Sequence, residues 1–303
     1  MSILIHAQTQ MLVQGITGSQ ASVDTMRALR YGASIMAGVT PGRGGESVHG
    51  IPVYDTVAEA QRDHRLDATI VYAPPFAVRD AVLEAIEAGI PLVVVTAEGV
   101  PIHDAVHVIT AARRADIKLV GCNTNGIISP GRSRIGGIGG EDPAEIYAPG
   151  RIGICSRSGG MSAELARTLK FAGLGVSTCV SMGGDRITGL GMADYARLFE
   201  EDGDTDAIVV FGEPGTRNER DLAAAVREGH VAKPVVALIA GVFQEDYPPG
   251  QTFGHAAALV RNHDDTASAK MALLRDAGAL VVQTLDEIPS RIIQALATRH
   301  ERS

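Results

Sequence analysis

MLVQGITGSQ, residues 11–20, passes from a short apolar run through a glycine-bearing turn into an amphipathic segment. A strand that leads through such a turn into a helix begins a βα unit, and repeated βα units build parallel sheets. Gly15 and Gly18 let the backbone approach a ligand closely, and the amides that open a helix favour a phosphate group. The segment therefore predicts an open α/β sheet with a candidate phosphate-binding turn. Glycines needed only for the conformation of the turn would leave the same pattern.

Similar βα units follow this segment as far as residue 121. Strands are expected at Met11–Gln14, Ser34–Val39, Ala68–Tyr72, Leu92–Val95 and Lys118–Gly121, and helices at Ser19–Tyr31, Val57–Arg65, Phe76–Ala88 and His103–Ala115. A loop-rich stretch, residues 123–150, then interrupts the alternation with many glycines and several prolines. Such a composition is typical of a connection between domains.

The alternation resumes after the loop-rich stretch. Strands are expected at Arg151–Cys155, Val176–Ser181, Ala207–Phe211, Pro234–Ile239 and Leu280–Gln283, with helices at Gly160–Phe171, Met192–Glu201 and Asn218–Glu228 and another that begins at His255. The sequence therefore predicts an α/β protein with two doubly wound domains, residues 1–125 and 146–303, joined by a linker at 126–145.

Charge and cysteine usage exclude several classes of protein. The formal net charge of −8 comes without any block of Lys and Arg, which argues against a nucleic-acid partner. No apolar run approaches the roughly 18 residues of a membrane span. Cys122, Cys155 and Cys179 form no CxxC pair, so we expect neither a metal site nor a disulfide framework. Free thiols and the absence of a signal-peptide pattern favour the cytoplasm, or an organelle matrix after processing.

The end of the second expected strand distinguishes between nucleotide ligands. A dinucleotide site usually has a carboxylate there to hold the ribose, but none occurs before Glu46. Instead, the glycine-rich loop of residues 38–45 carries Arg43, whose guanidinium suits a second phosphate. Thr96, Ala97 and Glu98 follow another strand at the same edge of the sheet. A cofactor with separated phosphates, such as CoA, fits better than NAD, unless Arg43 is a solvated charge and Glu98 a helix cap.

The second domain has its own candidate site. Ser156 to Gly160 form another phosphate-type turn before a helix, without the lysine of a P-loop; a plain N-cap role for Ser158 is the alternative. His255 lies between Gly254 and Ala256, so an imidazole has space around it. Glu213 ends an apolar strand, and its carboxylate could hold one imidazole nitrogen while the other acts as nucleophile. A lone histidine and a strand-end glutamate are each more often structural or solvated.

Taken in order, these motifs resemble the succinyl-CoA synthetase α-subunit family. The likeness extends over nearly the whole chain and includes Gln14–Gln20, Gly38–Gly45, Ser156–Gly159, Gly183-Gly184-Asp185, Gly212-Glu213 and Gly254-His255-Ala256. The resemblance implies a Rossmann-like CoA-binding domain followed by a flavodoxin-like parallel α/β domain. It also implies a partner β subunit of the ATP-grasp type, which uses Mg-ATP or Mg-GTP, in an αβ or α2β2 assembly.

The resemblance also assigns roles to residues. His255 would carry the phosphoryl group, Glu213 would orient its imidazole, and Ser158, Gly159 and Gly160 would hold the phosphoryl group. CoA would be held by Thr17, Gly18, Ser19, Gln20, Arg43, Thr96, Ala97 and Glu98. The product would be an acyl-CoA thioester, formed from a small carboxylic acid by way of an acyl phosphate.

Three departures from the family pattern concern the acid. Ala163 replaces a tyrosine on the substrate side, Gly121 to Gly126 differ from the family's Gly-Pro-Asn-Cys-Pro-Gly, and the loop Phe243–Phe253 is longer and more acidic. We therefore expect a small di- or polyfunctional acid other than succinate, with malate, citrate and sulfonated acids as candidates, unless the longer loop compensates. Two other classes stay open: a non-catalytic or regulatory CoA-binding protein, and an NAD-dependent oxidoreductase.

Overall fold

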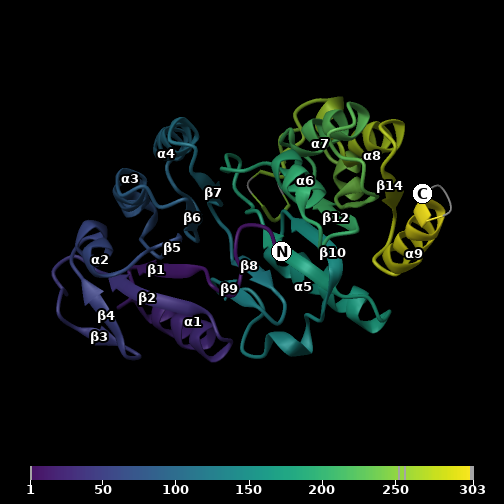
Figure 1. The fold of residues 1–303 in the computed structure, drawn as a ribbon. Coiled ribbons are helices and arrows are strands. Elements are labelled where there is room, and N and C mark those ends of the chain that lie inside the picture. Colours follow the sequence, from purple (N-terminus) through teal and green to yellow (C-terminus); the bar gives the residue numbers. More distant parts are fainter. Residues whose placement is uncertain (1, 252, 256, 301–303) are drawn as a thin grey trace. The chain divides into compact units, whose positions relative to one another are not determined.

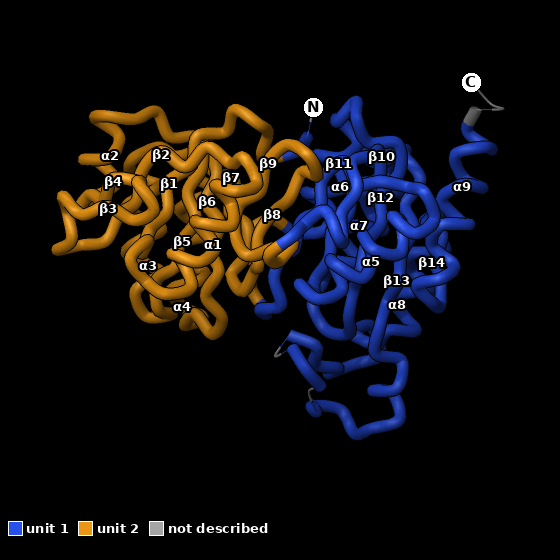
Figure 2. Tube along the Cα trace, turned by 90° about the horizontal axis from the view of Figure 1, so that it is seen from below, with its two compact units in different colours: residues 1–3, 142–186, 191–303 blue, residues 4–141, 187–190 orange. Residues whose placement is uncertain are grey.

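The computed structural model describes residues 2–251, 253–255 and 257–300, so Thr252 of the long loop and Ala256 of the histidine motif lie outside the described residues. The chain divides into two compact units (Figure 2). One comprises residues 4–141 and 187–190, and the other comprises residues 1–3, 142–186 and 191–303. No helix in the described ranges is long and apolar enough to cross a membrane.

The first unit is built on a sheet in the order β3-β4-β2-β1-β5-β6-β7 (Figure 1). Its strands are β1 (Gln10–Gln14), β2 (Ser34–Val39), β3 (Ser47–Val48), β4 (Ile51–Tyr54), β5 (Ala68–Val71), β6 (Leu92–Val95) and β7 (Lys118–Val120). The short β3 pairs antiparallel with β4, and the other pairings are parallel. Without β3, the order from β4 to β7 is that of the Rossmann fold, which reverses between β1 and β5.

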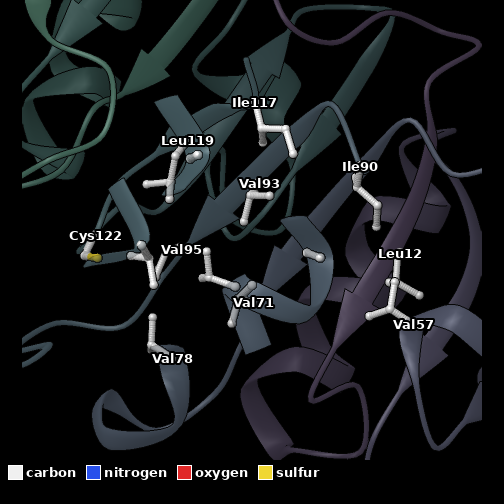
Figure 3. Close-up of a cluster of buried hydrophobic side chains, with 14 of the residues drawn as sticks. Leu12, Val57, Val71, Val78, Ile90, Val93, Val95, Ile117, Leu119 and Cys122 are labelled. Atoms are coloured by element: carbon white, nitrogen blue, oxygen red, sulfur yellow. The ribbon is translucent and has the colours of Figure 1, made fainter. Parts of the chain in front are cut away.

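Helices cover both faces of this sheet. They are α1 (Ser19–Arg30), α2 (Val57–Asp63), α3 (Val78–Glu87) and α4 (Ile102–Arg114). The last three bury their apolar sides on one face, where Val57 and Val78 join Leu12, Val71 and Val95 of the strands (Figure 3). Each such side chain stabilises the fold by roughly 1.5–3 kcal/mol when it is fully buried. This core fixes the carboxyl ends of β1, β5 and β6 at one edge.

The second unit contains five parallel strands in the order β14-β13-β12-β10-β11. They are β10 (Pro149–Ser156), β11 (Val176–Ser181), β12 (Ala207–Gly212), β13 (Val235–Ile239) and β14 (Leu280–Val282). The helices are α5 (Gly159–Phe171), α6 (Met192–Glu201), α7 (Asn218–Arg227), α8 (Ala267–Asp276) and α9 (Glu287–His300). The strand order is flavodoxin-like and reverses between β10 and β12, so a ligand crevice is expected at their carboxyl ends. The predicted fold class is thus confirmed.

Three segments differ from the sequence prediction, and the first of them, the strands β3 and β4, was not expected at all. The helix expected from His255 is wrong: His255 lies in an irregular loop, and α8 begins only at Ala267, where the Thr266 side chain accepts a hydrogen bond from the Ala269 amide. Residues 126–145, expected as a linker, include an antiparallel hairpin of β8 (Gly126–Ser129) and β9 (Ser133–Ile135). The hairpin forms because its isoleucines are fully buried, which a free connection would not allow.

Candidate active site

His255 and Glu213 form the centre of the site in the second unit. The Nδ1 atom of His255 lies 2.8 Å from Oε2 of Glu213, which directly follows β12. A carboxylate can only accept, so this contact favours the tautomer that carries its proton on Nδ1 and its lone pair on Nε2. The two side chains are 29% and 14% exposed, so the imidazole remains reachable while the carboxylate is largely covered. The predicted juxtaposition of the two residues is present.

Gly184 lies against the opposite edge of the imidazole. A Cβ atom built at this position would be 2.9 Å from Nε2 and 2.8 Å from Cδ2 of His255, closer than ordinary van der Waals contact. Its backbone does not have the positive φ that favours glycine, so the requirement at Gly184 is space. The loop after β11 therefore leaves room for the ring only because residue 184 has no side chain.

The side chain of Arg157 donates hydrogen bonds to this loop, and sequence reasoning did not single it out. It follows β10, its side chain is buried, and its Nη2 atom donates to the carbonyls of Gly184 and Asp185 at 3.2 and 3.1 Å. Its Nη1 atom is buried without a hydrogen-bond partner in the part of the chain that the structure describes. Buried arginines are uncommon unless they are paired. The position of Arg157 between two serines of a phosphate-type turn was the only signal in the sequence.

The turn after β10 opens α5 in the predicted way. Ser158 is the N-cap residue, and its Oγ accepts from the Met161 amide at 3.4 Å. This is the N-cap geometry that sequence reasoning left open as the alternative role. Gly159 and Gly160 form the first turn, whose amides have no carbonyl partner within the helix. Ala163 lies one turn further along α5 than Gly159 and is half-buried. The turn thus combines capping with a set of amides that can bind an anion.

Two further buried charges lie behind Glu213, and neither was expected from the sequence. Lys270 of α8 and Glu219 of α7 form an ion pair with Nζ–Oε2 at 2.5 Å. In a helix sequence each would pass as a surface residue, because only the tertiary packing shows that their side chains are covered. Among the described residues, no group of three or more His, Cys, Asp or Glu side chains is arranged to hold a metal ion.

The glycine turn of the first unit lies between β1 and α1. Gly15 has φ +78°, and a Cβ there would lie 2.7 Å from the carbonyl oxygen of Tyr72, so both conformation and space require glycine. Gly18 is the N-cap of α1 and provides no side-chain cap for the amides of Ser19 and Gln20. Thr17 Oγ1 lies 3.2 Å from Oγ1 of Thr40, which joins this turn to the loop after β2.

Arg43 lies in that loop and already has a partner. Its Nη2 atom donates to Oε2 of Glu46 at 2.7 Å, and its Nε atom donates to Oε1. The hydrogen bond from Arg43 holds the pKa of the Glu46 carboxyl below its usual range. Both side chains are exposed, so the pair is screened by solvent and can exchange for a phosphate contact.

A pocket of about 400 Å³ lies at the carboxyl edge of the first unit. Its lining consists of Gln20, Asp24, Arg27, Tyr72, Thr96, Thr124, Asn125 and Gly137. Two predicted ligand-binding residues, Gln20 and Thr96, therefore share one pocket. Arg43, Ala97 and Glu98 are not part of its lining. Glu98 is exposed and does not cap α4, which has no side-chain cap, so the alternative role considered for it is wrong.

Comparison with known proteins identifies related domains over most of the chain. Two family models match: "CoA binding domain" over residues 6–99 and "Succinyl-CoA ligase like flavodoxin domain" over residues 149–293. Subunit alpha 1 of the ADP-forming succinate–CoA ligase of Archaeoglobus fulgidus is 42% identical over 295 residues, 97% of this chain and 98% of that protein. The malate–CoA ligase subunit alpha of Methylorubrum extorquens is 38% identical over 302 residues, 98% and 99% of the two chains.

A solved structure is also similar over the whole chain. It is ATP citrate lyase from Methanothrix soehngenii in complex with citrate and coenzyme A, with a TM-score of 0.91 and 28% identity. The match covers 99% of this chain and 51% of the lyase chain, so this chain corresponds to about half of the lyase.

Proposed function

Because the chain belongs to the family of succinate–CoA ligase α subunits, we propose that it is the CoA-binding, phosphoryl-carrying subunit of an acid–CoA ligase. The observation that supports the chemistry is the 2.8 Å contact between Glu213 and His255 Nδ1. With its proton on Nδ1, the imidazole has a nucleophilic lone pair on Nε2. The carboxylate also stabilises the positive charge that develops on the ring during attack.

The reaction would proceed in three transfers. His255 Nε2 attacks the terminal phosphorus of Mg-ATP or Mg-GTP bound by an ATP-grasp β subunit, and the nucleoside diphosphate leaves. The phosphoryl group then passes to the carboxylate of the acid, which gives an acyl phosphate and restores the imidazole. Finally, the thiolate of CoA attacks the acyl carbon and phosphate leaves. During these steps Ser158 caps α5, and the amides of Gly159 and Gly160 at its N-terminus provide an anion site for the transferred group.

CoA would bind to the first unit at the carboxyl edge of its sheet. The α1 turn of Thr17, Gly18, Ser19 and Gln20 offers amides and hydroxyls to a phosphate. Arg43 would release Glu46 and bind a second phosphate of CoA. Thr96, Ala97 and Glu98 border the same edge. NAD fits less well because Glu46, the first carboxylate after β2, is already paired with Arg43. The acid would be a small di- or polyfunctional one, since Ala163 leaves more space than a tyrosine would.

The decisive experiment is phosphorylation of His255. The chain is incubated with its β subunit and radiolabelled Mg-ATP or Mg-GTP, and the label is tested for lability in acid. We expect acid-labile label in the wild type, none in His255→Asn, and unchanged labelling in the control His230→Asn, whose histidine lies on the surface. Full labelling of His255→Asn would refute the assignment. CoA binding without any label would instead favour a non-catalytic CoA-binding protein.

A further inference from the structure

Lys270 and Glu219 hold the backbone of Glu213 from both sides. The ammonium group of Lys270 donates to the carbonyl of Glu213 at 2.6 Å, while Oε1 of Glu219 accepts from the amide of Glu213 at 3.2 Å. Both polar groups of the Glu213 backbone are therefore bound by the same buried pair. The side chains of Lys270 and Glu219 are 3% and 0% exposed, so water does not compete for these bonds.

The contacts of Lys270 use its full donor capacity. An ammonium group has three hydrogens, and Nζ has three acceptors: the carbonyls of Glu213 and Gly215 and the carboxylate of Glu219. The close approach of Glu219 also depends on Gly212, because a Cβ at that position would lie 2.4 Å from Oε1 of Glu219. The turn after β12 is thus held at three backbone groups: the amide and the carbonyl of Glu213 and the carbonyl of Gly215.

Stability alone does not account for the pair. Burying two charges costs desolvation energy, and apolar residues of similar volume are often as stabilising or more so. A buried pair that aims its donors and acceptors at one short turn does, however, fix the conformation of that turn. The turn carries Glu213, and the carboxylate of Glu213 contacts His255 Nδ1.

We infer that Lys270 and Glu219 are positioning residues for phosphoryl transfer: they hold the Glu213 turn so that its carboxylate meets Nδ1 and the Nε2 lone pair faces the incoming phosphoryl group. This inference rests on the proposed role of His255. It concerns two residues that hydrogen-bond to the backbone of the Glu213 turn and to each other. Their effect is on the tautomer and nucleophilicity of His255, and it is separable from folding.

The test uses the double variant Lys270→Met/Glu219→Gln, which removes both charges together and leaves no unpaired ion in the core. Potassium phosphoramidate phosphorylates imidazoles directly, with loss of ammonia, so no partner subunit is needed. Site-resolved mass spectrometry gives the labelling rate of His255 relative to the exposed His230. We expect this rate to fall roughly 10- to 150-fold, the range for loss of one charge-assisted hydrogen bond. Nitrogen-15 NMR should show His255 losing its preference for the Nδ1–H tautomer.

Lys233→Met is the matched control. Lys233 is half-buried and donates to the carbonyls of Phe199 and Asp202 at 2.7 Å, but it precedes β13 at the opposite end of the sheet. This variant should lose stability and keep the labelling rate and tautomer of His255. Lys270→Arg provides a second variant should the double one not fold. Its guanidinium keeps the charge and cannot direct three donors to the same points, so it should also slow labelling.

The outcomes separate the two proposals. Wild-type labelling and tautomer in a folded double variant or in Lys270→Arg would overturn the positioning role. If His255 keeps its dependence on Lys270 in NMR and yet takes no label from Mg-ATP or Mg-GTP with a β subunit, the positioning role stands and the proposed function fails.

Discussion

Gly184→Ala adds a single methyl group at a position where the imidazole of His255 already lies. The new Cβ would meet Cδ2, Nε2 and Cε1 of His255 at 2.8, 2.9 and 3.0 Å, whereas ordinary contact begins at 3.4 Å. The ring is the end of a rotatable side chain, so we expect it to move away by roughly 0.5 Å or more at little cost to folding. That movement weakens the 2.8 Å bond to Glu213.

The expected loss follows from the environment of that bond. A hydrogen bond to a charged group contributes about 1.5–3 kcal/mol. Since the imidazole is 29% exposed, solvent partly screens the contact, and the lower end of the range applies. About 1.5 kcal/mol corresponds to a roughly tenfold slower phosphorylation of His255.

Phosphoramidate labelling of the single chain measures this loss. The exposed His230 is an internal reference, and thermal melting reports on the fold. Gly203→Ala is the matched control, because a Cβ at Gly203 has no heavy atom within 4 Å and its backbone has no positive φ. Labelling of His255 in Gly184→Ala at the wild-type rate would show that the ring does not need the contact with Glu213, and the argument from geometry would fail.

Three other predictions follow from the described residues. Arg43→Ala should weaken CoA about 10- to 150-fold in calorimetric titration, whereas Glu46→Gln, which releases Arg43, should strengthen it; unchanged affinity in both removes Arg43 from the site. Burial raises the pKa of Cys179 to about 12 and that of Cys155 well above 9, so these thiols stay protonated in the folded chain while the unfolded chain ionises. Urea unfolding should therefore show stability falling as pH rises above about 9, by about 1.4 kcal/mol per thiol at pH 10, and constant stability would contradict this. With a β subunit, kcat/KM should be higher for malate, citrate or sulfoacetate than for succinate, and a tenfold lead for succinate would refute the argument from Ala163.

The regular part of the fold was predictable because its signals are local. The segment from Met11 to Gln20 contains an apolar strand, a glycine turn and a helix start within ten residues, and the structure has β1, the turn and α1 there. The hairpin of β8 and β9 was missed because its strands have only four and three residues and lie among glycines. The start of α8 was misplaced since small residues after His255 resemble a helix, whereas the N-cap that determines the start is Thr266.

The candidate site, like the fold, could be predicted only where its signals are local in the sequence. Glu213 and His255 could be paired from the sequence because a strand end and a glycine-flanked loop both point to the carboxyl edge of a parallel sheet. Arg157, Glu219 and Lys270 could not, because burial of a charge depends on what packs over it. Lysine and glutamate favour exposed helix positions so strongly that a buried pair has no distinct signature in a single sequence.

The glycines of the second unit show how the site accommodates its charges. Gly184 leaves space for the imidazole, Gly212 leaves space for the carboxylate of Glu219, and a Cβ at Gly215 would lie 2.1 Å from the carbonyl oxygen of Ala257. Each position faces a polar partner in the His255–Glu213 region. A side chain at Gly184 would displace the imidazole and one at Gly212 the carboxylate of Glu219, whereas one at Gly215 would meet the backbone of Ala257. Glycine at Gly184 and Gly212 is therefore required by the polar groups packed against it, and at Gly215 also by the backbone, whose φ is +78°.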